Sequence, residues 1–513
     1  MSIPGRDQNI SAFAFMQRES FLIALLCMAG AVTGLGYVIL PGYQFLIVLL
    51  LCVIFVTGAL KPEYTFYLLL FVLVEEMVQY FSTYAPVYQV RIYPYTIPLV
   101  ATAIGLLIAK IAKNIEFVRT SIDVLLLLVV FYESLSLLWA PVFNVGVWLT
   151  VLLLSNYLLF FITKNMIWDE VILKRAVGVW ITAGVIAAIS IAVSQWVTLE
   201  KTIYITQSSG FKMAFEEQVD RPAGLAGVDH VAGFVSMAFF MTLGTMAAAQ
   251  GRMVKFGYLV LALLMLTSII LTTSRGVIIG VGGAYIFFIL MHSHFKGKFI
   301  RYLFLFIMVL IVVVLVVKPG FIDRMLIGFG YTGDLLFSDK AYTGTEASTS
   351  TGEGLSGMEI RMIWWKNGFY EMVRHPLEFL FGQGIGGFYY YSAGGTTVSS
   401  PEANGIIPAF LYDMGIFGGV MFLLLFIITA TTIIRVFRTA QKNYAYYMLL
   451  GATAGLIAET GIHGLIDYDL TSYGSKYFWF PLGFTMAVLN LVKRSTKKAE
   501  LAHDQEPVSS GAR

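Results

Sequence analysis

Three arginines from distant parts of the chain have the chemistry to bind a phosphate group. Arg221 opens the segment Arg-Pro-Ala-Gly-Leu, Arg275 lies between two apolar runs with almost no linker, and Arg361 opens Arg-Met-Ile-Trp-Trp. A guanidinium group binds phosphate through two parallel hydrogen bonds. Arginines at a membrane boundary also commonly extend toward lipid headgroups, and this alternative stays open for all three. The residues indicate anion binding at a membrane surface.

Side chains that could move a proton stand in the same part of the sequence. His375 precedes a proline that predicts the end of a short helix. Glu402 and Asn404 precede a long apolar run, where a carboxylate and an amide could orient or deprotonate a hydroxyl group. The same two residue types are favoured at helix starts, so a capping role is the alternative. Further polar residues follow Arg221 and Arg361 in sequence: Asp229, His230 and Arg374.

The composition requires that lipid surround these residues. Of 513 residues, 58% are hydrophobic and 13% are charged, and the mean hydropathy is +0.78. A soluble domain could not bury so much apolar surface. Helical apolar runs of roughly 17–25 residues cross a bilayer. The sequence therefore predicts an all-α polytopic integral membrane protein with about fourteen transmembrane helices, near 21–40, 43–60, 64–82, 95–112, 121–140, 145–166, 176–199, 231–250, 255–274, 276–292, 302–317, 406–434, 444–466 and 477–492.

Basic residues predict the orientation of these spans. Most of the 34 Lys and Arg residues lie on the side of the two termini, which the positive-inside bias makes cytoplasmic. All three arginines then lie outside, and the run at 406–434, longer than a span needs, predicts an interfacial turn before Pro408. The expected organisation is a cytoplasmic segment 1–20, a transmembrane bundle 21–317, a large external loop 318–405 carrying short helices, spans over 406–492 and an irregular cytoplasmic tail 493–513.

Other features of the composition exclude or favour further classes of protein. The net charge of +3 is too small to indicate a nucleic-acid partner. Cys27 and Cys52 lie in apolar runs, which predicts inert core residues and no disulfide or metal site. Acids inside apolar runs favour a proton-coupled or ion-coupled transporter as an alternative function. These acids are Glu75, Glu76, Glu133 and Glu459, with His463 nearby.

Taken in order, these segments resemble the O-antigen ligase and O-antigen polymerase superfamily of bacterial surface-polysaccharide assembly. The resemblance covers about 220–420 and depends on the joint order of degenerate motifs. The motifs are the three arginine segments, Asp229, His375-Pro376-Leu377 before the glycine-rich 382–386, and Asn404 before Asp413-Met-Gly415.

This resemblance implies a GT-C-like glycosyltransferase of the bacterial inner membrane, acting at its periplasmic face on an undecaprenyl-pyrophosphate-linked glycan. Arg221, Arg275 and Arg361 would bind the diphosphate and stabilise its negative charge as it leaves. A base would activate the acceptor hydroxyl, whose attack at the anomeric carbon favours inversion. The resemblance implies no cofactor and no metal. The implied partners are membrane lipid, a chain-length regulator and a flippase.

One position departs from the pattern of the ligases. They carry a histidine immediately before the asparagine that opens the span after the loop, and Ala403 stands there. Glu402 or His375 is left as the candidate base. The missing histidine favours a polymerase of repeat units. The first alternative is a ligase that transfers finished glycan to lipid A core, and the second is a flippase or exporter of lipid-linked sugars.

Overall fold

The computed structural model describes sixteen helical segments in part of the chain, and some of the predicted functional residues lie outside that part. The described residues are 42–73, 95–113, 116–193, 228–293, 308, 365–366, 368–370, 372–387, 405–467 and 475–504. Arg275, Arg374 and His375 are among them, as are His230 and the backbone of Asp229. Outside the described residues lie Arg221, Arg361, Glu402, Asn404, Cys27, Glu75, Glu76, the predicted spans 21–40 and 302–317, and most of the predicted loop 318–405.

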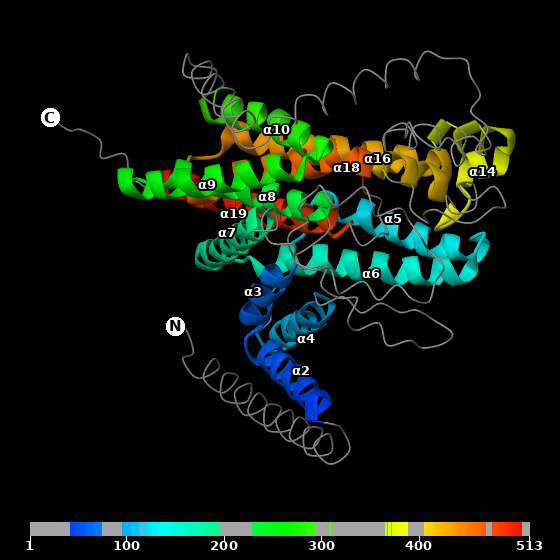
Figure 1. Cartoon of the computed structure of the whole chain (residues 1–513), viewed down its shortest axis with the longest axis horizontal. Helices are drawn as coiled ribbons and strands as arrows, with labels where there is room; N and C mark the ends of the chain where they lie inside the picture. The colour runs from blue at the N-terminus through cyan, green and yellow to red at the C-terminus, as the bar shows by residue number, and fades with distance from the viewer. Residues whose placement is uncertain are drawn as a thin grey trace.

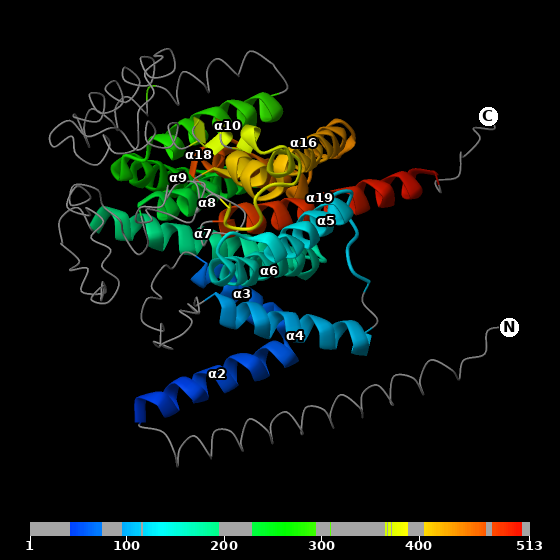
Figure 2. The ribbon, with the colours of Figure 1, turned by 90° about the vertical axis from the view of Figure 1, so that its right-hand side faces the viewer.

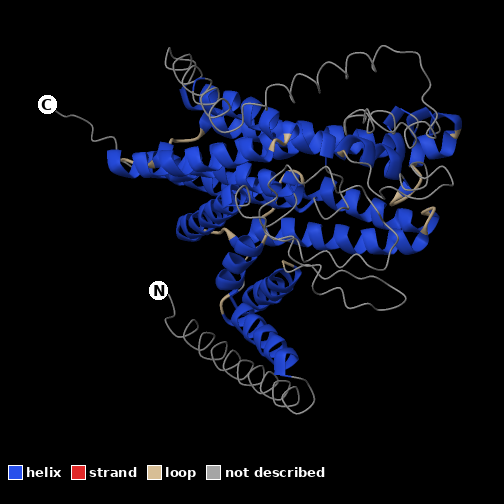
Figure 3. Ribbon diagram, in the orientation of Figure 1, coloured by secondary structure: helices blue, strands red, loops and turns tan. Residues whose placement is uncertain are grey.

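Helices account for the regular structure of the described residues, which contain no strand (Figure 3). Six of them are long and apolar enough to cross a bilayer: α6, α7, α8, α9, α10 and α16. This confirms a helical membrane protein, while the count of about fourteen spans stays a prediction. The helices of the first half are α2 (Gly42–Leu60), α3 (Pro62–Val72), α4 (Thr96–Lys113), α5 (Asp123–Leu135), α6 (Phe143–Met166) and α7 (Glu170–Val193), with a short 3₁₀ turn, η2 (Ser136–Trp139), after α5. Those of the second half are α8 (Val228–Ala248), α9 (Arg252–Thr272), α10 (Arg275–Ser293), α14 (Pro376–Phe381), α16 (Ile406–Thr439), α17 (Tyr444–Leu456), η4 (Ile457–His463), α18 (Gly464–Asp467) and α19 (Lys476–Asp504).

The helices form one bundle whose long members run side by side. In Figure 1, α9, α10, α16 and α6 lie roughly along the horizontal axis, while α2, α3 and α4 extend below them. Within the bundle α8 packs on α9 and α17, and α19 packs on α6 and α17. Figure 2 shows α19 extending past the ends of its neighbours toward the C-terminus. This arrangement leaves the short segment η4–α18 between α8, α10 and α16.

Small residues and aromatic rings bring the helices close together. A Cβ on Gly58 of α2 would lie 2.6 Å from the carbonyl oxygen of Ala101 in α4, and one on Gly483 of α19 would lie 2.7 Å from that of Phe160 in α6. Glycine is therefore needed where two backbones approach so closely. Elsewhere rings fill the core, as where Trp180 of α7 meets Phe480 of α19 with centroids 4.6 Å apart.

Two expectations about helix ends are wrong. The run 406–434 does not begin with a turn before Pro408, because α16 is already helical from Ile406. Instead, α16 bends at Gly415 (φ 66°, ψ −159°), and the ring of Phe410, before the bend, lies 5.1 Å from that of Phe422 after it. Glycine adopts this left-handed conformation without the Cβ clash that other residues meet. The tail is also not irregular throughout, because α19 continues as a helix to Asp504.

Candidate functional site

Arg275 begins α10 at a turn that leaves it little freedom. The preceding helix, α9, ends at Thr272, and Thr273 takes the left-handed conformation (φ 55°) with its N–H donating to the carbonyl oxygen of Ile270. Thr272, Thr273 and Ser274 are buried, whereas the Arg275 side chain is half-buried. The turn therefore connects two spans without a linker and fixes the Cα of Arg275 at the end of the bundle. A positive side chain at a helix N-terminus is suited to binding an anion.

Directly beneath this turn is a buried pair of ionisable residues in η4. A Cβ on Gly276 would lie 2.7 Å from Cδ2 of His463, so the imidazole ring touches the backbone next to Arg275. Nδ1 of His463 lies 3.0 Å from Oε1 of Glu459, and both side chains are fully buried. The hydroxyl of Ser236, from α8, donates to Oε2 of the same carboxylate at 3.1 Å. The pair therefore joins α8 and α10 through η4.

The segment that follows Asn404 meets the same part of the bundle. A Cβ on Gly405 would lie 2.7 Å from the carbonyl oxygen of Leu465, two residues beyond His463. The same Cβ would lie 3.0 Å from the ring of Trp365, four residues beyond Arg361. Described neighbours of three sequence motifs thus meet at η4–α18: Gly276 of the Arg275 motif, Gly405 of the Asn404 motif, and Trp365 of the Arg361 motif.

A buried lysine that the sequence did not single out lies on another side of this region. Lys476 begins α19, is fully buried, and has its Nζ 4.9 Å from the ring centroid of Tyr477 and 5.6 Å from that of Tyr95. The ring of His230, at the start of α8, lies 5.9 Å from that of Tyr477. His230 therefore stands one aromatic ring away from a buried ammonium group. Positive charge inside a membrane is costly and is often functional. The sequence did not indicate that Lys476 is buried, because a single lysine where a loop meets a span is a common feature.

His375 and Arg374 lie in a different place, at the outer tip of α16. Pro376 is the first residue of α14, where its missing N–H costs nothing; it therefore opens one helix as well as ending another. In Figure 1, α14 lies beyond the end of α10, next to α16. Both His375 and Arg374 are exposed. The structure thus separates His375 from the buried pair beneath Arg275.

The glycine-rich segment 382–386 follows α14 and forms a joint, in the sense that it hydrogen-bonds both to η2, which follows α5, and to α16. The N–H of Gln383 donates to the carbonyl oxygen of Tyr412 at 2.8 Å, and that of Ile385 donates to Oγ of Ser136 at 2.8 Å. Gly382, Gly384 and Gly386 all have positive φ, between 74° and 89°. These contacts explain the glycines by packing and hydrogen bonding.

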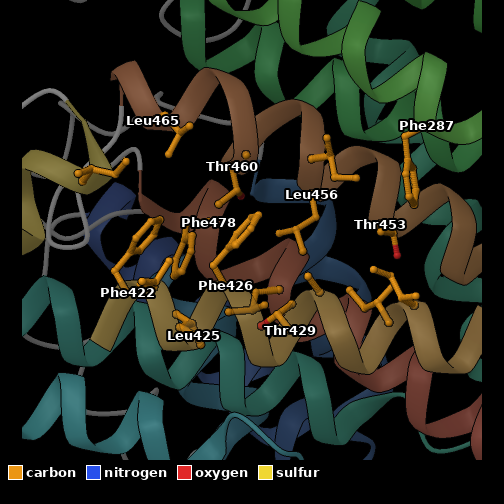
Figure 4. A pocket seen from close by; sticks show the side chains of 18 residues that line it. Phe287, Phe422, Leu425, Phe426, Thr429, Thr453, Leu456, Thr460, Leu465 and Phe478 are labelled. Atoms are coloured by element: carbon orange, nitrogen blue, oxygen red, sulfur yellow. The ribbon is translucent and has the colours of Figure 1, made fainter. Parts of the chain in front are cut away.

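An apolar pocket of about 410 Å³ lies between α16 and the α17–η4 segment (Figure 4). Phe422 and Phe426 of α16 and Phe478 of α19 form much of its wall, and Thr460 of η4 contributes a hydroxyl group. Its lining is suited to a hydrocarbon chain. Because Ile457 and Thr460 of η4 line the pocket while His463 contacts α10, η4 lies between the pocket and the start of α10.

Together these features define a multi-pass helical membrane protein with a cationic turn above a buried acid–histidine pair. Residues 260–423 match the family described as O-antigen ligase. This match, over 164 of the 513 residues, supports the resemblance to the O-antigen ligase and O-antigen polymerase superfamily that the motifs predicted. The matched region contains Arg275, Arg361, His375 and Asn404 and ends before Glu459. A comparison with curated proteins finds no match.

Within the part of the chain that the structure describes, no group of three or more His, Cys, Asp and Glu side chains is arranged to hold a metal ion. Cys52 is a free, partly buried thiol, and the inert role expected for it stays a prediction. Glu133 is buried in α5, in the part of the bundle that packs on α6 and α16.

Proposed function

We propose that this chain is a polymerase of lipid-linked oligosaccharide repeat units of an O-antigen or exopolysaccharide. Its donor is an undecaprenyl-pyrophosphate-linked glycan at the periplasmic face of the bacterial inner membrane. The observation that carries the proposal is the turn at Arg275, which lies inside the region matched to the O-antigen ligase family and fixes a guanidinium at the end of two spans. Its geometry is suited to a diphosphate held at the membrane surface.

Contacts around η4–α18 support the gathering of the other two arginines at this place. Gly405 lies against Leu465 there, Trp365 lies against Gly405, and Trp365 is four residues after Arg361 in the sequence. His230, at the end of the Arg221 segment, begins α8, which packs on η4. The apolar pocket beside η4 provides a surface for the hydrocarbon tail of a lipid-linked donor. Under this proposal, Arg221, Arg275 and Arg361 bind the two phosphates.

The reaction is a single displacement at the anomeric carbon of the donor sugar. The acceptor hydroxyl oxygen forms the new bond while the bond from that carbon to the diphosphate oxygen breaks, and its electron pair leaves with the diphosphate. Guanidinium groups stabilise the charge that develops there. The hydroxyl proton goes to a base, for which Glu402 and His375 are the candidates. Attack from the face opposite the leaving group inverts the configuration.

The ligase is the second candidate function, and the description of the matched family favours it. Deleting the gene in a smooth-type host separates the two. Loss of a polymerase leaves lipid A core carrying a single repeat unit. Loss of a ligase leaves bare core, with glycan retained on its lipid carrier. We expect the single-repeat product.

A flippase or exporter of lipid-linked sugars is the third candidate, and the membrane-embedded acids favour it. Glu75→Gln and Glu76→Gln change acids that the glycosyl-transfer reaction does not use. We expect this double variant to elongate glycan at the wild-type rate in proteoliposomes. A transporter would be favoured if the wild type moved lipid-linked sugars without ever elongating glycan and the double variant lost that movement.

The direct test is reconstitution of the purified chain with lipid-linked repeat units and no nucleotide sugar. Gel analysis of the glycan should show ladders that lengthen with time. Product that stays at one repeat unit, with lipid A core present and modified, would instead identify a ligase.

A further inference from the structure

The start of α10 packs on η4 through one stripe of glycines. Gly276, Gly280 and Gly283 recur at helical spacing on the same face of α10. A Cβ on Gly276 would lie 2.7 Å from His463, one on Gly283 would lie 2.7 Å from Ile462, and one on Gly280 would meet the backbone of Ala458. At these three positions α10 has no side chain between its backbone and η4, so the position of Arg275 follows directly from the position of η4.

The imidazole that touches Gly276 is fixed on its other side. Nδ1 of His463 and Oε1 of Glu459 lie 3.0 Å apart, and the second carboxylate oxygen accepts from Ser236. All three side chains are fully buried. Both carboxylate oxygens are therefore engaged, and the ring can neither rotate nor move away without breaking a buried hydrogen bond.

Glu459 and His463 both lie in η4, which is π-helical. Its wider turn has the N–H of Gly464 donating to the carbonyl oxygen of Glu459. Single π turns inside helices commonly occur at functional sites. A buried acid–histidine pair is also an expensive way to join helices, since apolar side chains of similar volume often stabilise as well or better. Its presence directly below Arg275 therefore calls for a functional explanation.

We propose that Glu459 and His463 are positioning residues for the anion site at Arg275. The carboxylate holds the imidazole ring, and the ring supports the backbone of Gly276 so that the Arg275 guanidinium stays where a diphosphate binds. Neither residue touches substrate, because both are fully buried. The inference depends on the proposed function only for the identity of the anion as the diphosphate of a lipid-linked donor.

The experiment exploits the contact between Gly276 and His463. Gly276→Ala places a methyl group against a ring that cannot yield, so the turn must shift. His463→Ala removes the support. Each single variant should weaken binding of farnesyl diphosphate to the purified, full-length protein by about tenfold or more, because a displacement of ~1 Å at a binding group can cost up to ~100-fold. Binding is measured by titration calorimetry in detergent.

The double variant G276A/H463A provides the decisive comparison. The space left by the imidazole accepts the new methyl group, so the double variant should bind better than the product of the two single effects predicts. Gly282→Ala is the matched control on the same helix, since a Cβ there meets nothing within 4 Å. This variant should bind farnesyl diphosphate as the wild type does. Wild-type binding by G276A, or strictly multiplicative losses in the double variant, would refute the positioning role.

A second pair of variants separates positioning from general stability. Glu459→Gln keeps an oxygen that can accept from Ser236 and retains a hydrogen-bonding partner for the ring, whereas Glu459→Leu removes both. E459Q should retain most of the diphosphate affinity, while E459L should lose it with the same fold-change as H463A. Equal melting temperatures with unequal affinities support positioning. Melting temperatures that fall while the affinity of the folded fraction stays at the wild-type value would overturn it.

Binding and elongation are measured on the same preparations, so the two proposals can fail separately. If the wild type binds farnesyl diphosphate with the predicted pattern among variants but never elongates glycan, the polymerase fails and the positioning role stands. If the wild type elongates glycan while G276A, H463A and E459L all bind and react normally, the positioning role fails and the polymerase stands.

Discussion

The backbone N–H of Gly387 donates a 3.1 Å hydrogen bond to Oδ1 of Asp413, and the N–H of Gly384 donates to the carbonyl oxygen of the same residue at 3.1 Å. Asp413 lies two residues before the bend in α16, and its side chain is buried. One residue therefore fastens the glycine-rich segment to the outer tip of α16, using both its backbone and its side chain.

Removing that carboxylate should loosen the tip. Asp413→Ala removes one of the two acceptors of the Gly387 N–H, which also donates to the carbonyl oxygen of Gly384 at 2.8 Å, so we expect a loss of about 0.5–1.5 kcal/mol. Asp413→Asn retains an acceptor oxygen and should cost less. Thermal unfolding of the purified variants, followed by light scattering or intrinsic fluorescence, measures the difference. Equal stability of the two variants would show that the side-chain hydrogen bond is not needed.

The glycine at 384 should be among the least replaceable residues in this joint. Its φ is 89°, and a Cβ would lie 2.6 Å from the carbonyl oxygen of Ser136. Gly384→Ala combines a backbone strain of about 1–3 kcal/mol with a steric clash, so we expect a clearly lowered unfolding temperature. Gly178→Ala is the matched control, because a Cβ there meets nothing within 4 Å and alanine favours the helix. A tolerated G384A would mean that the segment repacks.

Apolar runs predicted many of the described helices because run length is a local property, whereas the orientation expected from basic residues stays a prediction. The run lengths and the Lys and Arg positions are properties of short segments, and the described helices lie close to the runs. The turn at Arg275 was likewise visible, since two apolar runs meet there without a linker. Local patterns of this kind depend only on neighbouring residues, so a single sequence contains them.

The missed features depend on contacts between distant segments. Nothing in the sequence around Gly276 indicates that His463 lies against it. Glu459, with His463 nearby, was one of the acids that favoured a transporter as an alternative, because the sequence does not show that the pair packs between α8 and α10. The excess length of the run 406–434 was explained by an interfacial turn before Pro408, and the bend at Gly415 was missed, because proline gives a stronger local signal than a glycine whose left-handed φ is set by packing. Tertiary contacts thus determined both outcomes.

Arg275 should be needed for activity as a guanidinium and not merely as a positive charge. Arg275→Ala should reduce the elongation rate by roughly 10²–10³-fold, the usual cost of losing a preorganised donor to the developing charge. Arg275→Lys should recover only part, since an ammonium group cannot form two parallel hydrogen bonds. Arg252→Ala is the matched control, because Arg252 also begins a span but is exposed at the start of α9. Near-wild-type elongation by R275A would exclude the proposed role.

A buried ion pair far from Arg275 should affect stability without affecting chemistry. Nζ of Lys164, which is 3% exposed, lies 2.6 Å from Oδ1 of Asp123, which is 25% exposed. Lys164→Met leaves the carboxylate without its cation, and we expect a loss of about 3 kcal/mol, at the low end for buried pairs because Asp123 stays partly in contact with solvent. Adding Asp123→Asn should restore part of that loss.

The same K164M protein tests whether the elongation assay reports the site or merely folding. Its elongation rate per folded molecule should equal that of the wild type, whereas its unfolding temperature should fall. If the elongation rate per folded molecule fell in proportion to stability, the rates of the Arg275 variants would have to be corrected for their own loss of stability before they are interpreted.

Elongation should continue when divalent metal ions are removed. The proposed reaction neutralises the leaving diphosphate with guanidinium groups, which already provide the charge that Mg²⁺ supplies in many phosphate-binding enzymes. Product ladders formed in excess EDTA should therefore match those formed in Mg²⁺, and a soluble metal-dependent glycosyltransferase in the same buffer should lose activity as a control. If EDTA stops elongation and added Mg²⁺ restores it, arginines alone do not neutralise the diphosphate, and a metal ligand must lie among the residues around Arg275.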